Sequence, residues 1–250
     1  MSALDTLLAR LIDDAGQFPP ARKPVERAVE DHRAARSGPH AWMLGRFLCP
    51  ASKLREDLPR PLGVVSDGDW RADLEAAVAA GADAFEVRAP DELDALAAAP
   101  LAVFVEDVDD LDALAAAGVG AKLRCGGATP DAFPSDERVA AFLRGCRERG
   151  LPFKLTAGLH HPFRTRDEQI GVLQHGFANL LAATVLDDVG AVVAERDPAA
   201  FSLGPAGLSW RGQAVDPASA RALYTAHGSC SFGEPVDDLL ALGALEAAHA

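Results

Sequence analysis

The sequence predicts an α/β fold, a parallel (β/α) barrel of the TIM-like type that becomes irregular after its sixth strand. Three observations indicate this fold. Short apolar runs alternate with amphipathic helical patterns, "DELDALAAA" at 91–99 recurs as "DDLDALAAA" at 109–117, and no glycine fingerprint of an open doubly wound sheet occurs. Such βα repetition favours parallel strands joined by right-handed crossovers. The alternative is an open three-layer α/β sheet.

Residues 1–40 are expected to form an N-terminal helical extension of a single domain that spans 1–250, because no linker of low apolar content divides the chain. The run "MSALDTLLARLIDDAG" has the period of an amphipathic helix over 2–15, which would pack outside the barrel or close its bottom. Acidic residues replace the basic region that an export signal would need.

Six apolar runs are predicted to be consecutive barrel strands, at 41–49, 61–67, 83–88, 101–107, 120–125 and 151–158. The segments between them have helical periodicity, with Asp or Ser at their starts and Gly or Pro at their ends. The last third is less regular. There "HGFANLLAATVLDDVGAVVAERDP" is helical in pattern and "FSLGPAGLSWRGQAV" predicts a hairpin around Gly204, so a regular seventh and eighth strand are not predicted.

The amino-acid composition excludes several classes of binding partner. A net charge of −13 without a basic patch argues against nucleic acid and against anionic membranes, and no apolar stretch has transmembrane length. The four cysteines are widely spaced and form no CxxC, which indicates reduced thiols in a cytoplasmic protein. A nucleophilic Cys230 in "HGSCSFGEP" is a minor alternative. The expected partner is a small, anionic substrate, and a homo-oligomer is left open.

Charged side chains interrupt the predicted strands, where near-continuous apolar residues are expected. Because alternate strand residues share a face, these side chains would point into the barrel and form a polar pocket at its C-terminal end. The alternative is a structural network of ion pairs that fills the barrel. The charged residues are Glu86, Arg88, Glu106, Lys122, Arg124 and Lys154.

Lysine usage makes two of these residues the leading catalytic candidates. The chain has four lysines against twenty arginines, yet Lys122 and Lys154 both lie inside predicted strands. Only lysine can lose its proton on burial and act as a base or an imine-forming nucleophile. We expect Lys154 to be that group, Lys122 to lower its pKa by like charge, and Glu86 or Glu106 to move protons. The alternative is that arginine is too large for both places.

His160 follows the sixth predicted strand and is expected to be an acid/base group over the pocket. The two glycines of "RCGG" would let backbone amides approach an anion. No cofactor is predicted; in the alternative, Glu86, Glu106 and His160 or His161 would bind one divalent metal ion, although no motif such as HExxH supports it. The candidate substrate-binding residues are Arg46, Arg88, Arg124, Gly126, Gly127, Thr156, His161 and Asn179.

The segments "LIDDAGQFPPA", "GPHAWMLGRFLCPAS", "KLRCGG", "FKLTAGLHHPFR" and "SCSFGEPVDDL" together resemble an uncharacterised bacterial protein family, a likeness that covers nearly the whole chain and implies no activity. Two lysines on neighbouring barrel strands also look like those of class I aldolases of the deoxyribose-phosphate type, as an analogy of chemistry and fold. The prediction is therefore a lyase-like or aldolase-like enzyme of a carbonyl or carboxylate compound. The alternatives are a metal-assisted hydrolase or isomerase and a non-catalytic anion-binding protein.

Overall fold

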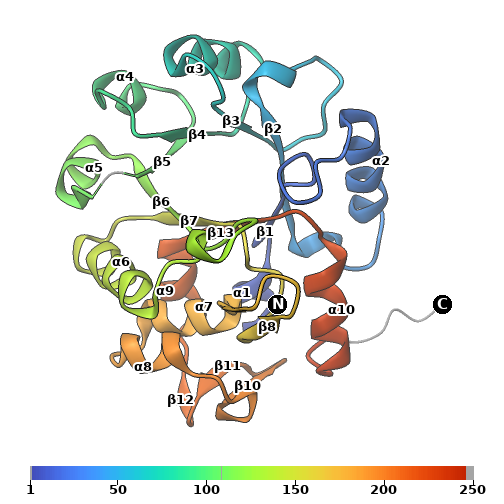
Figure 1. Ribbon diagram of the computed structural model, residues 1–250, viewed down its shortest axis with the longest axis vertical. Helices are drawn as coiled ribbons and strands as arrows, with labels where there is room; N and C mark the ends of the chain where they lie inside the picture. The colour runs from blue at the N-terminus through green and yellow to red at the C-terminus, as the bar shows by residue number, and fades with distance from the viewer. Residues whose placement is uncertain (1, 108, 246–250) are drawn as a thin grey trace.

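The computed structural model describes residues 2–107 and 109–245 and has the predicted closed parallel barrel (Figure 1). Each strand pairs with the next around the ring, and the last strand returns to the first, where Ile12 lies opposite His227. The barrel strands are β1 (Ile12–Asp14), β2 (Leu44–Pro50), β3 (Leu62–Val65), β4 (Ala84–Arg88), β5 (Ala102–Glu106), β6 (Gly120–Arg124), β7 (Phe153–Thr156) and β13 (Tyr224–Ser229).

Helices surround the barrel, with α2 to α6 following the strands around its outside (Figure 1). Their ends match the predicted signals: Asp69 caps α3 through its side chain, and α6 ends at Gly150, which has a left-handed backbone. The helices are α1 (Ala3–Leu8), α2 (Val25–Arg36), α3 (Trp70–Ala79), α4 (Asp94–Ala97), α5 (Leu111–Ala117), α6 (Asp136–Arg149), α7 (Phe177–Val185), α8 (Val189–Ala194), α9 (Pro217–Leu223) and α10 (Gly233–Ala241).

Two small sheets lie in the segment between β7 and α9. The hairpin predicted around Gly204 is present as β10 (Phe201–Gly204) and β11 (Gly207–Trp210), extended by β12 (Gln213–Ala214). A second hairpin, β8 (Thr165–Asp167) with β9 (Val172–Gln174), was not predicted. The helical pattern between these two sheets was read correctly, since it forms α7 and α8.

The two ends of the chain correct the predicted strand count. The helix expected over 2–15 stops at Leu8, and Ile12–Asp14 form the first barrel strand, so the segment 1–40 is not purely a helical extension. The last barrel strand, Tyr224–Ser229, was not predicted either. Both strands are short or polar: β1 has three residues, two of them aspartates, and all three are buried.

The apolar core lies between the barrel and its helices. Phe85, Phe153 and Leu155 are fully buried there, on the outward faces of their strands as the alternation predicts. The inward faces of the same strands are consequently left to the charged residues. No helix in the described part of the chain is both long and apolar enough to cross a membrane.

Candidate functional site

The charged strand residues form a chain of ion pairs across the barrel interior. Lys154 Nζ donates to Asp13 Oδ2 at 2.5 Å and also to Glu86, whose other oxygen lies 2.8 Å from Lys122 Nζ. The chain then continues from Lys122 to Glu106. Cations and carboxylates alternate along this ion-pair chain, which consists of Arg46, Asp13, Lys154, Glu86, Lys122, Glu106 and Arg124.

Lys154 is the buried centre of this chain and does not line a cavity. Its relative exposure is 0 %, and both of its carboxylate partners are buried as well. An amine that is enclosed by two carboxylates has no room for a carbonyl substrate. The prediction that Lys154 is an accessible nucleophile is therefore wrong, and its role is to neutralise Asp13 and Glu86.

The pKa values of its neighbours agree with a charged network. Burial raises the pKa of Glu86, but attraction to Lys122 and Lys154 outweighs it and brings that pKa down to about 2. Burial also opposes the charge on Lys122, yet Glu86 and Glu106 leave its pKa above the ordinary value. Lys122 was expected to act on Lys154 by like charge, but Glu86 lies between the two ammonium groups and pairs with both.

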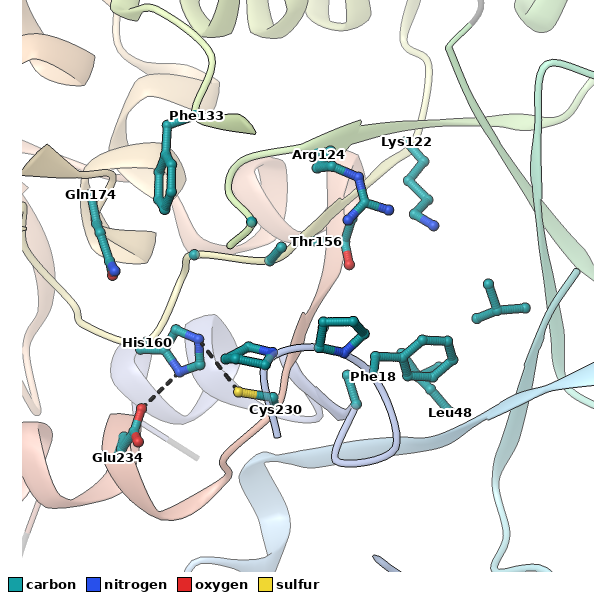
Figure 2. Close-up of a pocket in the computed structure, with 18 of the residues that line it drawn as sticks. Phe18, Leu48, Lys122, Arg124, Phe133, Thr156, His160, Gln174, Cys230 and Glu234 are labelled. Atoms are coloured by element: carbon teal, nitrogen blue, oxygen red, sulfur yellow. Dashed lines mark hydrogen bonds and ion pairs between the residues drawn. The ribbon is translucent and has the colours of Figure 1, made fainter. Parts of the chain in front are cut away.

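A cavity of about 460 Å³ opens above the ion-pair chain, at the C-terminal ends of the barrel strands. This volume suits a small metabolite. Apolar side chains line part of it, including Phe18, Leu48 and Phe133, and Figure 2 shows them around the same space as the polar groups. The N-terminal segment "GQFPPA" lines this end of the barrel through Phe18, Pro19 and Pro20.

One side of the cavity carries two cationic side chains. Lys122 and Arg124, which we call the cationic wall, both line it. The ion-pair chain contains four cations and three carboxylates, which leaves a net charge of +1. Arg124 donates from Nε to Glu106 at 3.0 Å, but its side chain is 49 % exposed, so the rest of its guanidinium is accessible to a ligand.

The opposite side of the cavity holds a cysteine, a histidine and a glutamate (Figure 2). Cys230 Sγ lies 3.7 Å from His160 Nε2, and His160 Nδ1 lies 2.8 Å from Glu234 Oε2. Ser229 Oγ is also 3.4 Å from Nδ1. We call these three residues the Cys–His–Glu group. A carboxylate on Nδ1 keeps the proton there and leaves the Nε2 lone pair facing the sulfur.

Short turns hold this group in place. His160 follows Gly158, which has a left-handed backbone with φ of 68°. A Cβ on Gly158 would lie 2.9 Å from the Cys125 carbonyl oxygen, and one on Gly126 would lie 2.8 Å from the Gly158 Cα. The two glycines thus let the loops after β6 and β7 touch. Cys230 lies between the end of β13 and the start of α10.

The cavity contains many of the predicted residues. Glu86, Lys122, Arg124, Gly127, Thr156, His160 and His161 line it. Glu106 lies behind them and bonds Lys122 and Arg124. His161 faces the cavity but pairs with Asp238 in α10 at 2.7 Å.

Four predicted binding residues have other contacts. The Arg88 side chain is 73 % exposed and pairs with Asp107 outside the cavity. Arg46 lies against Asp13 in the ion-pair chain, Nη1 being 3.7 Å from Oδ2. Gly126 makes the turn contact just described. Asn179 is fully buried and donates to the carbonyl oxygens of Val192 and Glu195, so it joins α7 to the end of α8.

The residues of the metal alternative are not brought together. Glu86 and Glu106 accept from the two lysines, whereas His160 bonds Glu234. Within residues 2–107 and 109–245, no three His, Cys, Asp or Glu side chains form a group suited to a metal ion.

Sequence reasoning missed three features of the site. Cys230 was considered without its partners. His160 lies 70 residues earlier in the chain, and no sequence motif indicated a role for Glu234. Gln174 was not considered at all, although it is buried and lines the cavity. Asp13 was hidden inside an expected helix; the acidic pair "DD" in an otherwise apolar stretch was the available signal.

Comparison with known proteins gives no relative: no protein-family model, no curated protein and no solved structure matches this chain. The two resemblances drawn from the sequence therefore stay predictions, and function has to be argued from the site.

Proposed function

We propose that this protein is an enzyme that acts on a small anionic carbonyl or carboxylate compound by acid–base chemistry of the lyase kind. The observation that supports it best is the pairing of a cationic wall with a histidine–carboxylate pair across one cavity. The first part suits the negative charge of a substrate, and the second suits proton transfer. The imine route of the aldolase analogy is not part of the proposal, because Lys154 is enclosed.

In the proposed reaction, Arg124 and Lys122 bind the carboxylate or the carbonyl oxygen. When a bond next to the carbonyl breaks, negative charge develops on the enolate oxygen, and the two cations stabilise it. His160 takes or returns the proton at Nε2, since Nδ1 is bonded to Glu234. Phe18, Leu48 and Phe133 reduce the water around the reacting atoms and so strengthen these charge interactions.

Composition supports the setting of this activity. The net charge of −13 leaves the cationic wall as a local exception, which favours a small anion over a polyanion. The four free cysteines suit a reducing compartment, so we keep the cytoplasm as the proposed location.

Anion binding tests the proposal before any substrate is known. Malonate and inorganic phosphate should raise the melting temperature of the wild-type protein, and Arg124→Gln should weaken the binding about tenfold through the loss of one charged hydrogen bond. Arg88→Gln is the matched control, because Arg88 is also a strand-end arginine but lies outside the cavity. Equal binding by both variants, or no binding by the wild type, would contradict the proposal.

A non-catalytic anion-binding protein is the second candidate, supported by the exposed guanidinium of Arg124. A panel of anionic oxo acids and acyl compounds separates the two. Turnover that depends on His160 supports the enzyme. Tight binding of panel members without any turnover supports the binding protein.

A further inference from the structure

The Cys–His–Glu group has the geometry of an activated nucleophile. Two parts of the chain that are far apart in sequence supply it: the loop after β7 supplies His160, and the turn after β13 and the start of α10 supply Cys230 and Glu234. The group lines the cavity, so a ligand can reach the sulfur. A thiol next to a histidine whose other nitrogen is held by a carboxylate is an arrangement suited to covalent catalysis.

We propose that Cys230 is the nucleophile of this site, that His160 is its base, and that the substrate is an acyl compound with an anionic group. This inference rests on the proposed function, because the cationic wall is what would bind the anionic end. It goes beyond the lyase-type step, because the substrate here has a carbonyl carbon with a leaving group and the reaction is transfer of its acyl group to Cys230 and then to water.

The protonation states support a base-assisted thiol. Burial raises the pKa of Cys230, with the charge of Glu234 adding to the effect, so the sulfur is a thiol at neutral pH. Burial lowers the pKa of His160 despite attraction to Glu234, so its imidazole is neutral and can accept the thiol proton. Proton transfer therefore accompanies attack, in contrast to a preformed thiolate–imidazolium pair.

A buried acceptor indicates a further feature of the substrate. Gln174 Nε2 donates to Asp167 Oδ2 at 2.9 Å, which fixes the amide orientation. Its Oε1 is buried at the cavity and has no hydrogen-bond partner within the described residues. Leaving a buried acceptor unpaired is costly, so the ligand is expected to supply an N–H or O–H group there.

The covalent step balances without another reagent. A bond forms between Cys230 Sγ and the carbonyl carbon, and the thiol proton moves to His160 Nε2. The bond from that carbon to its leaving group breaks, and the leaving group takes the proton from His160. Water then adds to the thioester with His160 as base, which releases a carboxylic acid and restores the thiol.

Two alkylating agents of the same size test this without a known substrate. Iodoacetate is anionic and iodoacetamide is neutral; each would form an S–CH₂ bond at Cys230, release iodide and leave the thiol proton on His160. Rates are measured on the full chain with peptide mass mapping and normalised to glutathione. The other cysteines are fully buried, and burial raises the pKa of Cys125 and Cys146 to about 12, so labelling should be confined to Cys230.

We expect the wild type to favour iodoacetate over iodoacetamide about tenfold more than glutathione does, because the cationic wall concentrates anions. Arg124→Gln should remove this preference, and Arg88→Gln should keep it. His160→Asn should lower both rates about a hundredfold through loss of the base. Glu234→Gln, at a half-exposed side chain, should lower them about tenfold, and His40→Asn outside the cavity should not.

The outcomes separate the two proposals. Unchanged alkylation in both His160→Asn and Glu234→Gln would overturn the role of Cys230, whereas anion binding in the melting assay would leave the proposed function standing. Alkylation that depends on His160 but shows no Arg124-dependent preference would overturn the anionic substrate class and count against the proposed function. Labelling spread over other cysteines would also overturn the assignment of Cys230.

Discussion

The two sides of the cavity differ in how completely their charges are satisfied. Lys154, on the side of the ion-pair chain, has a carboxylate on each side and no exposed surface. His160 has a carboxylate on one nitrogen only, and its other nitrogen faces a thiol at the cavity. A charged residue inside a strand is thus weak evidence of chemistry until its partners are counted, because full pairing removes the reactivity that made the residue attractive.

Among the substitutions considered, one that breaks the ion-pair chain should have the largest effect on the free energy of unfolding. Lys154→Met leaves Asp13 and Glu86 as buried, under-compensated carboxylates, so the free energy of unfolding should fall by about 3–5 kcal/mol in urea titrations. Lys23→Met is the control: Lys23 also pairs with one aspartate, Asp31, but both are partly exposed, and the expected loss is below about 1 kcal/mol. Equal free energies of unfolding for Lys154→Met and wild type would mean that the ion-pair chain does not stabilise the fold.

One buried histidine, His227, sharpens the comparison through the pH dependence of stability. His227 is fully buried, donates to or accepts from Tyr224 Oη at 3.1 Å, and has its pKa lowered by burial to about 3. The unfolded chain binds this proton near pH 6.5, before the folded chain does, so stability is lost as pH falls from about 6.5 towards 3.

Replacing this histidine should remove part of that dependence. His227→Phe, which can keep the stacking on Phe177, should lose about 1.5 kcal/mol less than wild type between pH 6.5 and 5, measured by urea midpoints at both values. Glu86 of the ion-pair chain titrates below this window, since its pKa is about 2. Parallel pH curves for the two proteins would show that His227 is not held neutral.

A change at Gly158 should affect the thiol side alone. Gly158→Ala places a Cβ 2.9 Å from the Cys125 carbonyl oxygen on a left-handed backbone, so the turn that carries His160 has to shift. We expect a loss of about 1 kcal/mol in stability and a several-fold drop in Cys230 alkylation. Gly118→Ala is the control, since Gly118 is also left-handed but has open space around it. Equal alkylation in the two variants would contradict the role of this turn.

The smallest effect is expected at Arg88. Its ion pair with Asp107 is exposed, so Arg88→Gln should change the free energy of unfolding by less than about 0.5 kcal/mol and leave anion binding unaltered. A clear loss of anion binding in Arg88→Gln, measured by melting temperature, would mean that Arg88 contributes to anion binding together with the cationic wall.

The barrel was predictable where its pattern is repeated and hidden where the pattern is short. Strands β2 to β7 each have an apolar run, an α-helix follows each of β3 to β6, and all six strands were predicted. β1 has only three residues, so its period cannot be told from that of the helix before it, and β13 reads "YTAHGS" with few apolar residues. Because β1 was missed, Asp13 was missed, and Lys154 seemed to lack its second carboxylate.

The site was predictable in its location but not in its chemistry. Alternation along the strands placed Glu86, Lys122 and Arg124 at one cavity correctly. The meeting of Cys230 with His160 depends on ring closure between β13 and β7, which no local pattern encodes. The ion pairs within the barrel interior likewise depend on distances between strands. These distances determine which lysine is neutralised by carboxylates.

The pairing of β13 with β1, which closes the barrel, also determines when the site can form during synthesis. Ala15 and Phe18 near one end of the chain and Cys230 and Glu234 near the other line the same cavity, and Ala15 N donates to Ser229 O at 2.7 Å. A growing chain that lacks β13 has seven strands with an open seam and has no thiol at the seam. Cys230 therefore leaves the ribosome after His160 and Phe18, so its histidine partner and apolar cover are already made when it docks.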